Sequence, residues 1–176
     1  MRAATDLLIG YARYHRDERN IASHFVGVPM IVFSLGVLLA RPSFALGGLT
    51  LSPAWIVFAG VALWYIGRGL PALGIATSAV VGFLVGVAHQ VAHAGGVAVW
   101  FGWGVGVFML GWLVQAVGHW YEGRKPAFVD DLIGLLVGPM FMTAETLFAL
   151  GWNKPLSAEI ERRAGPTVVR DLARIA

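Results

Sequence analysis

The chain consists of long apolar stretches separated by short polar ones, and within each stretch the apolar residues lie on all sides rather than along one stripe. A helix that crosses about 30 Å of hydrocarbon needs roughly 20 such residues. The candidate stretches are 21–40, 53–67, 70–93, 96–120 and 128–152. None alternates apolar and polar residues as a membrane strand would. The pattern predicts an all-α, polytopic transmembrane helical bundle.

Basic residues decide how these segments are oriented, because cytoplasmic segments are rich in Lys and Arg. Arginines precede the first stretch and basic residues follow the last one, so both tails are expected in the cytoplasm. Five full crossings would separate the tails, but Pro139 can interrupt the last stretch. We therefore predict four full spans plus a fifth, broken or re-entrant helix. These form a transmembrane catalytic domain over 1–152, followed by a cytoplasmic C-terminal tail over 153–176 with no chemical role.

Composition narrows the classes of function. Hydrophobic residues make up 57% and charged residues 13% of the 176 residues, against about 25% charged residues in ordinary soluble chains. The chain has no cysteine, which excludes disulfides, thiolate ligands and cysteine nucleophiles. Its net charge of +3 comes from basic residues at helix ends, where anionic lipid head groups lie, so we expect no nucleic-acid partner. The composition, rich in Ala, Gly and Val, favours a bacterial inner-membrane protein.

Glycines four residues apart recur inside the apolar stretches, where small residues let membrane helices approach closely. We expect these pairs to pack helices together; they are Gly82 with Gly86, Gly102 with Gly106, and Gly134 with Gly138.

The histidines fall into two sets, and ionisable side chains at membrane depth are candidates for function. The predicted topology places His15, His24 and His119 at the cytoplasmic face, and His89 and His93 across the membrane. Imidazole suits iron, zinc, copper and nickel. On one continuous helix His15 and His24 would lie about half a turn apart. They can meet only if the chain bends between them, and we expect Asn20 to cap the helix after that bend.

Acidic and basic residues extend the cytoplasmic set. Glu122 follows His119 by three residues, and Asp130 and Glu145 lie on the fifth segment, so each is a candidate metal ligand or partner of a ligand. Arg124 is placed to hold a carboxylate. A zinc hydrolase acting on lipids could use the same ligands. A transporter with histidine proton relays is less favoured, because the ionisable residues gather at one face.

Two blocks of residues resemble the fungal iron-dependent 2-hydroxy fatty acid dioxygenase family, which acts in the α-oxidation branch of phytosphingosine breakdown. The first block is Tyr11-x-x-Tyr14-His15-x4-Asn20-x3-His24-x4-Pro29. The second block is Gly111-Trp112-x2-Gln115-x2-Gly118-His119, followed by Glu122-x-Arg124-x-Pro126-Ala127, Asp130, Pro139 and Glu145. The connection from His119 to Glu122 is one residue shorter than in the fungal pattern.

The resemblance implies a chemistry. It implies that His15, His24 and His119 hold Fe2+ as metal ligands, and that Glu122 and Arg124 belong to the catalytic set. The implied substrates are O2 and a 2-hydroxy fatty acid, which is shortened by one carbon through cleavage of its C1–C2 bond. The acyl chain would lie among the spans, in contact with membrane lipid. Neither the residues nor the resemblance indicates an oligomeric state.

Overall fold

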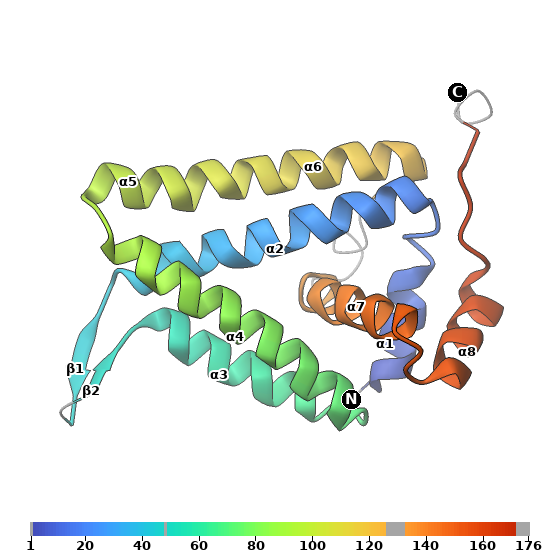
Figure 1. The fold of residues 1–176 in the computed structure, drawn as a ribbon, viewed down its shortest axis with the longest axis horizontal. Helices are drawn as coiled ribbons and strands as arrows, with labels where there is room; N and C mark the ends of the chain where they lie inside the picture. Colours follow the sequence, from blue (N-terminus) through green and yellow to red (C-terminus); the bar gives the residue numbers. More distant parts are fainter. Residues whose placement is uncertain (1, 48, 126–132, 172–176) are drawn as a thin grey trace.

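The computed structural model describes residues 2–47, 49–125 and 133–171. Nearly all the regular structure in this part of the chain is helical (Figure 1). The elements in chain order are α1 (Ala4–Ala12), α2 (Glu18–Ala40), β1 (Phe44–Leu46), β2 (Leu49–Leu51), α3 (Pro53–Ile66), α4 (Pro71–His93), α5 (Val97–Phe101), the π-helix η1 (Gly102–Gly106), α6 (Val107–Glu122), α7 (Gly134–Ala149) and α8 (Lys154–Ala164).

Within these described ranges, three helices are long and apolar enough to cross a membrane: α2, α4, and the continuous run of α5, η1 and α6. Two further apolar helices, α3 and α7, are shorter. The predicted all-helical fold is therefore confirmed, and the apolar stretches are the helices. The β-hairpin and the first helix were not predicted. The strands β1 and β2 form a short antiparallel hairpin, and α1 buries Leu7, Leu8 and Ile9 before the first long helix begins.

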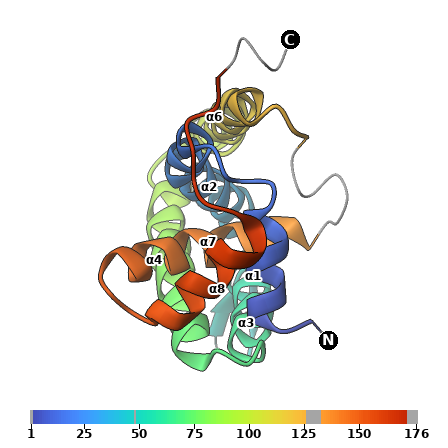
Figure 2. The same cartoon turned by 90° about the vertical axis from the view of Figure 1, so that its right-hand side faces the viewer.

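The long helices surround α2. It packs against α6 on one side and α4 on another, and α3 pairs with α4. In Figure 1, α2 and α6 run side by side, while α1, α7 and α8 gather at one end of the bundle. Figure 2 shows α7 running across that end rather than along the long helices. The segments near both termini therefore lie at the same end of the molecule.

The break expected at Pro139 is not observed, because α7 is one helix from Gly134 to Ala149 with this proline inside it. The hydroxyl of Tyr65 in α3 donates to the carbonyl of Leu136 at 2.9 Å, in the turn before Pro139. Neighbouring side chains of this kind let membrane helices accommodate proline. The helix is held against the bundle at the point where the proline weakens it.

Glycines bring α2 and α6 close together along the seam between these two helices. A Cβ atom on Gly27 would lie 2.9 Å from the carbonyl oxygen of Gly111, and a Cβ on Gly111 would lie 3.1 Å from that of Gly27. Of the glycines expected to pack helices, Gly82 and Gly138 do meet neighbours: an added Cβ would lie 2.8 Å from the Phe58 ring and 3.2 Å from the Tyr11 hydroxyl, respectively. A Cβ on Gly86, Gly102 or Gly106 would meet nothing within 4 Å. Spacing alone cannot show which face of a helix meets a neighbour.

We predict that Gly27→Ala or Gly111→Ala lowers the free energy of unfolding by about 1–3 kcal/mol, because the added methyl group pushes two backbones apart. Gly86→Ala is the matched control; it should leave stability unchanged or raise it slightly, since Ala is the better helix former. Unfolding in a denaturing detergent, followed by circular dichroism, measures both. Equal changes in the free energy of unfolding for Gly27→Ala and Gly86→Ala would contradict the close packing of α2 against α6 at Gly27.

Candidate metal centre

The connection between α1 and α2 carries His15 and makes the bend that the two histidines require. Helix α2 begins at Glu18, and its cap is Asp17 rather than the expected Asn20. The Asp17 carboxylate accepts from the backbone N–H of Arg19 at 2.9 Å. Bonds from the Arg19 side chain lower the pKa of Asp17 to about 2, so the cap stays ionised. The bend turns His15 back towards the first turns of α2.

The structure brings His15, His24 and His119 together from three separate segments. One ring nitrogen from each lies within 4.8 Å of the others, and all three side chains are buried. The Nε2 atoms of His15 and His24 are 3.2 Å apart. The ring of His119 lies edge-on to both, with centroids 5.0 Å away. The predicted convergence of these three histidines is therefore observed.

The hydrogen bonds behind the rings fix their orientation. The Nδ1 atom of His15 lies 2.8 Å from the carbonyl of Tyr11, and that of His24 lies 2.9 Å from the carbonyl of Asn20. Carbonyls only accept, so each Nδ1 carries the proton and each Nε2 presents a lone pair. Metal-binding histidines commonly make this bond to a carbonyl.

Two lone pairs facing each other at this distance favour a cation between them. Metal–nitrogen bonds of about 2.1 Å at angles of roughly 90–109° place two adjacent ligand atoms about 3.0–3.4 Å apart. The observed Nε2–Nε2 separation of 3.2 Å lies within that range. The Nδ1 atom of His119 is buried and, within the described part of the chain, has no hydrogen-bond partner. The donor set therefore fits a divalent transition metal.

Aromatic packing holds His15 in its neutral form. The ring of Tyr11 stacks on it with centroids 4.0 Å apart, and Phe141 of α7 lies against the same ring. Burial, reinforced by the neighbouring His24, lowers the pKa of His15 well below the usual value for histidine. The neutral imidazole is the form that binds metals.

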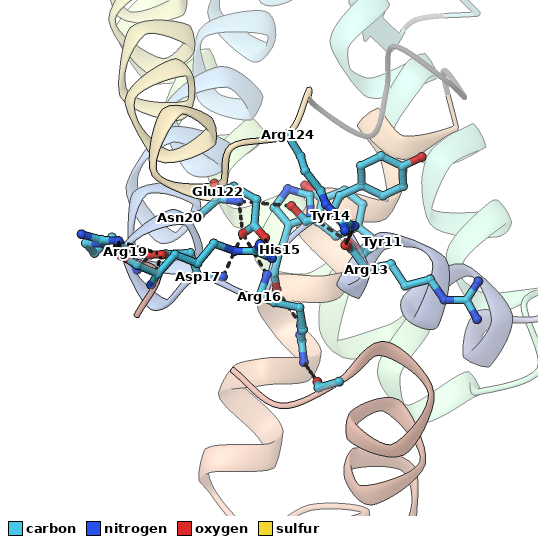
Figure 3. A network of polar contacts seen from close by, with 12 residues as sticks. Tyr11, Arg13, Tyr14, His15, Arg16, Asp17, Arg19, Asn20, Glu122 and Arg124 are labelled. Carbon is cyan, nitrogen blue, oxygen red and sulfur yellow. Dashed lines mark hydrogen bonds and ion pairs between the residues drawn. The ribbon is translucent and has the colours of Figure 1, made fainter. Parts of the chain in front are cut away.

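Glu122 lies at the end of α6, but its carboxylate bonds the connection that carries His15 (Figure 3). One oxygen, Oε2, accepts from the backbone N–H groups of Arg16 and Asp17 at 2.9 and 2.8 Å. The same oxygen accepts from the side-chain amide of Asn20 at 3.1 Å. Glu122 is buried and lies outside the histidine group.

Of the other predicted site residues, those that the structure describes are not members of the group of three imidazoles. Arg124 is exposed and donates to the backbone carbonyl of Arg13 at 3.1 Å (Figure 3). Glu145 is half-buried on α7 and outside the histidine group. Asp130 lies outside the described residues. His89 and His93 lie near the end of α4 with their rings tilted towards each other, the centroids 5.3 Å apart. They do not join the group, as predicted.

Two residues beside the site were missed. Tyr11 precedes His15 by four residues, and that helical spacing could have indicated the stack. Arg170, in the tail, donates to Oε1 of Glu122 at 2.6 Å. No spacing or motif connects residues so far apart in the sequence.

An apolar cavity of about 480 Å³ begins at the three histidines and continues between the helices. It reaches Leu39 on α2, which lies about 22 Å from His24 at the helical rise of ~1.5 Å per residue. Its polar lining is concentrated near the histidines, where Gln115 lies one turn before His119 on α6. Its walls come from α2, α3, α4, α6 and α7, and include Val32, Leu39, Ala54, Phe58, Val85 and Phe108.

The buried histidine group and the long apolar cavity agree with the family and the relative that the chain resembles. Residues 1–150 match the family described as 2-hydroxy-palmitic acid dioxygenase Mpo1-like. The chain is 32% identical over 157 residues to the 2-hydroxy-palmitic acid dioxygenase MPO1 of Saccharomyces cerevisiae, covering 86% of this chain and 83% of the yeast protein. No solved structure matches it. The family match and the yeast relative together show that the chain belongs to the Mpo1-like family.

Proposed function

We propose that this protein is an Fe2+- and O2-dependent dioxygenase that shortens 2-hydroxy fatty acids by one carbon. Membership in the Mpo1-like family supports the class of reaction. The observation that carries the proposal is the position of His15, His24 and His119 at one end of a cavity that is otherwise almost entirely apolar. A polar reacting head and a long acyl tail are the two parts that such a site accommodates.

In this proposal the three imidazoles are the metal ligands. They carry no negative charge, so the carboxylate of a 2-hydroxy acid complements the divalent ion that they hold. When bound, Fe2+ would supply the redox chemistry of O2 and open positions for the carboxylate and hydroxyl of the substrate. The proposed reaction would consume one O2 for each 2-hydroxy acid. It would release C1 as CO2 and yield one water and a fatty acid one carbon shorter.

The protein's other residues would bind and orient the substrate. The acyl chain lies along the cavity towards Leu39, because burial of each CH2 group contributes about 0.8 kcal/mol. Gln115 lines the cavity one turn from His119, where its amide can donate to the head group. Glu122 and Arg124 act as positioning residues, since both tie the end of α6 to the connection that carries His15.

We predict that wild-type protein purified without oxygen contains iron and consumes one O2 for each 2-hydroxy fatty acid shortened. His24→Ala should lower both iron content and turnover by at least about 100-fold, because losing a direct ligand exceeds the 10–100-fold loss typical of a ligand's partner. Elemental analysis, an oxygen electrode and mass spectrometry of the fatty acids measure these quantities. The matched control, His89→Ala, should change neither.

Three results would contradict the proposal. Wild-type protein that contains iron but does not consume O2 with any 2-hydroxy acid would rule out the proposed dioxygenase reaction. Protein that holds zinc and cleaves a lipid without O2 would favour a hydrolase instead. Loss of iron in His89→Ala, with His24→Ala unaffected, would place the metal at the C-terminal end of α4.

We also propose how the bundle sits in the membrane. Helices α2, α3, α4 and the run from α5 to α6 cross it, α7 is re-entrant at the cytoplasmic face, and the histidine group lies at that face of a bacterial inner membrane. The arrangement of both terminal segments at one end of the bundle supports this (Figure 1). The basic residues of both tails favour the cytoplasm.

A reporter fused after the last residue should therefore remain cytoplasmic. The matched control is the same reporter inserted at the turn before α5, which should be exported because three crossings precede it. An exported C-terminal reporter would mean that α7 crosses the membrane fully. A cytoplasmic reporter before α5 would contradict the crossing by α3.

A further inference from the structure

The segment after α8 forms a strap, residues 165–171, across the connection that carries His15. The backbone N–H of Val168 donates to the carbonyl of Arg16 at 2.8 Å. The N–H of Glu18 donates back to the carbonyl of Val168 at 3.0 Å. These bonds make a parallel bridge beside Asp17. The strap lies beyond residues 1–150, the part that matches the family.

Helix α8 positions the strap beside the connection that carries His15. Its buried side chains, Leu156 and Ile160, fix the helix against the bundle, where it packs on α1. Where α8 ends, the side chain of Arg16 donates to the carbonyl of Gly165 at 3.0 Å. The beginning of the strap is therefore anchored to the same connection that its far part crosses.

Arg170 joins both acidic residues that shape this connection. Its guanidinium pairs with Oε1 of Glu122 at 2.6 Å, and its backbone N–H donates to the Asp17 carboxylate at 2.8 Å. The carbonyl of Arg170 in turn accepts from Arg19 at 2.8 Å. A carboxylate as deeply buried as that of Glu122 needs a compensating charge, and Arg170 supplies one.

We propose that Arg170 is a positioning residue, and that the strap fixes His15 through Glu122 and so sets the metal affinity of the histidine group. The path is short: Arg170 holds one oxygen of Glu122, the other oxygen holds the N–H groups of Arg16 and Asp17, and His15 is the next residue back. The inference rests on the proposed metal site. Partners of metal ligands typically change affinity by about 10–100-fold.

The experiment compares Arg170→Ala with Arg162→Ala, the matched control. Arg162 is also an arginine of the tail, but it is exposed, and among the residues that the structure describes it pairs with Glu159 of the same helix. Titration with Fe2+ without oxygen should show affinity lowered about 10–100-fold in Arg170→Ala and unchanged in Arg162→Ala. Turnover of Arg170→Ala should return to the wild-type value at saturating Fe2+, which general unfolding would prevent.

A second measurement does not depend on metal. Hydrogen exchange at the Arg16 and Asp17 amides of metal-free protein should be faster in Arg170→Ala than in wild type or Arg162→Ala. Arg170→Lys keeps the charge but not the planar guanidinium, so its exchange rates should lie between those of wild type and Arg170→Ala. It replaces Arg170→Ala if that variant does not fold. In a Glu122→Gln background, Arg170→Ala should change neither the exchange rates nor the Fe2+ affinity further, because the ion pair between Arg170 and Glu122 is already lost.

The outcomes separate the two proposals. Wild-type protein that binds no Fe2+ overturns the metal site and with it the metal role of the strap, whereas the exchange rates still decide whether Arg170 fixes the connection. If wild type binds Fe2+ and Arg170→Ala binds it with the same affinity, only the proposed role of the strap in metal affinity is overturned. Additive effects of Glu122→Gln and Arg170→Ala overturn the path through Glu122.

Discussion

The close approach of α2 and α6 is the constraint on which the site depends. At the Gly27–Gly111 crossing no side chain separates the two backbones, so residues on the facing sides of the two helices are forced together along the seam. His24 and His119 lie towards one end of it, with ring centroids 5.0 Å apart. Such contact must come from shape, because lipid tails provide no hydrophobic force to drive helices together. Two of the three imidazoles are therefore positioned by helix packing.

The third imidazole is positioned by charge. His15 lies on a connection rather than in a long helix, and such segments need their backbone groups satisfied when buried. The Glu122 carboxylate satisfies two of these N–H groups from the end of α6, so the same helix that carries His119 also fixes the neighbours of His15. Charged and polar bonds at one end, and an apolar cavity beyond it, divide the site into a head region and a tail region.

Much of this arrangement follows from the sequence. The length and uniform apolarity of the stretches predicted the helices, and the positions of His15, His24 and His119 at helix ends on one side predicted their convergence. Other features could not be derived. Helix α1 is too short to be distinguished by length, and the face on which a glycine lies depends on the neighbour it meets. The bonds from Glu122 to Arg16 and from Arg170 to Glu122 join residues distant in sequence, so only the folded chain reveals them.

In the proposed site, three neutral imidazoles from three segments hold one metal ion at the head of the cavity. X-ray absorption of protein loaded with Fe2+ without oxygen tests it most directly, because outer-shell scattering identifies imidazole and counts it. We expect about three imidazole ligands, with nitrogen about 2.1 Å from the iron, and one fewer in His24→Ala protein that retains iron. A spectrum dominated by carboxylate oxygens, with one imidazole or none, would contradict it.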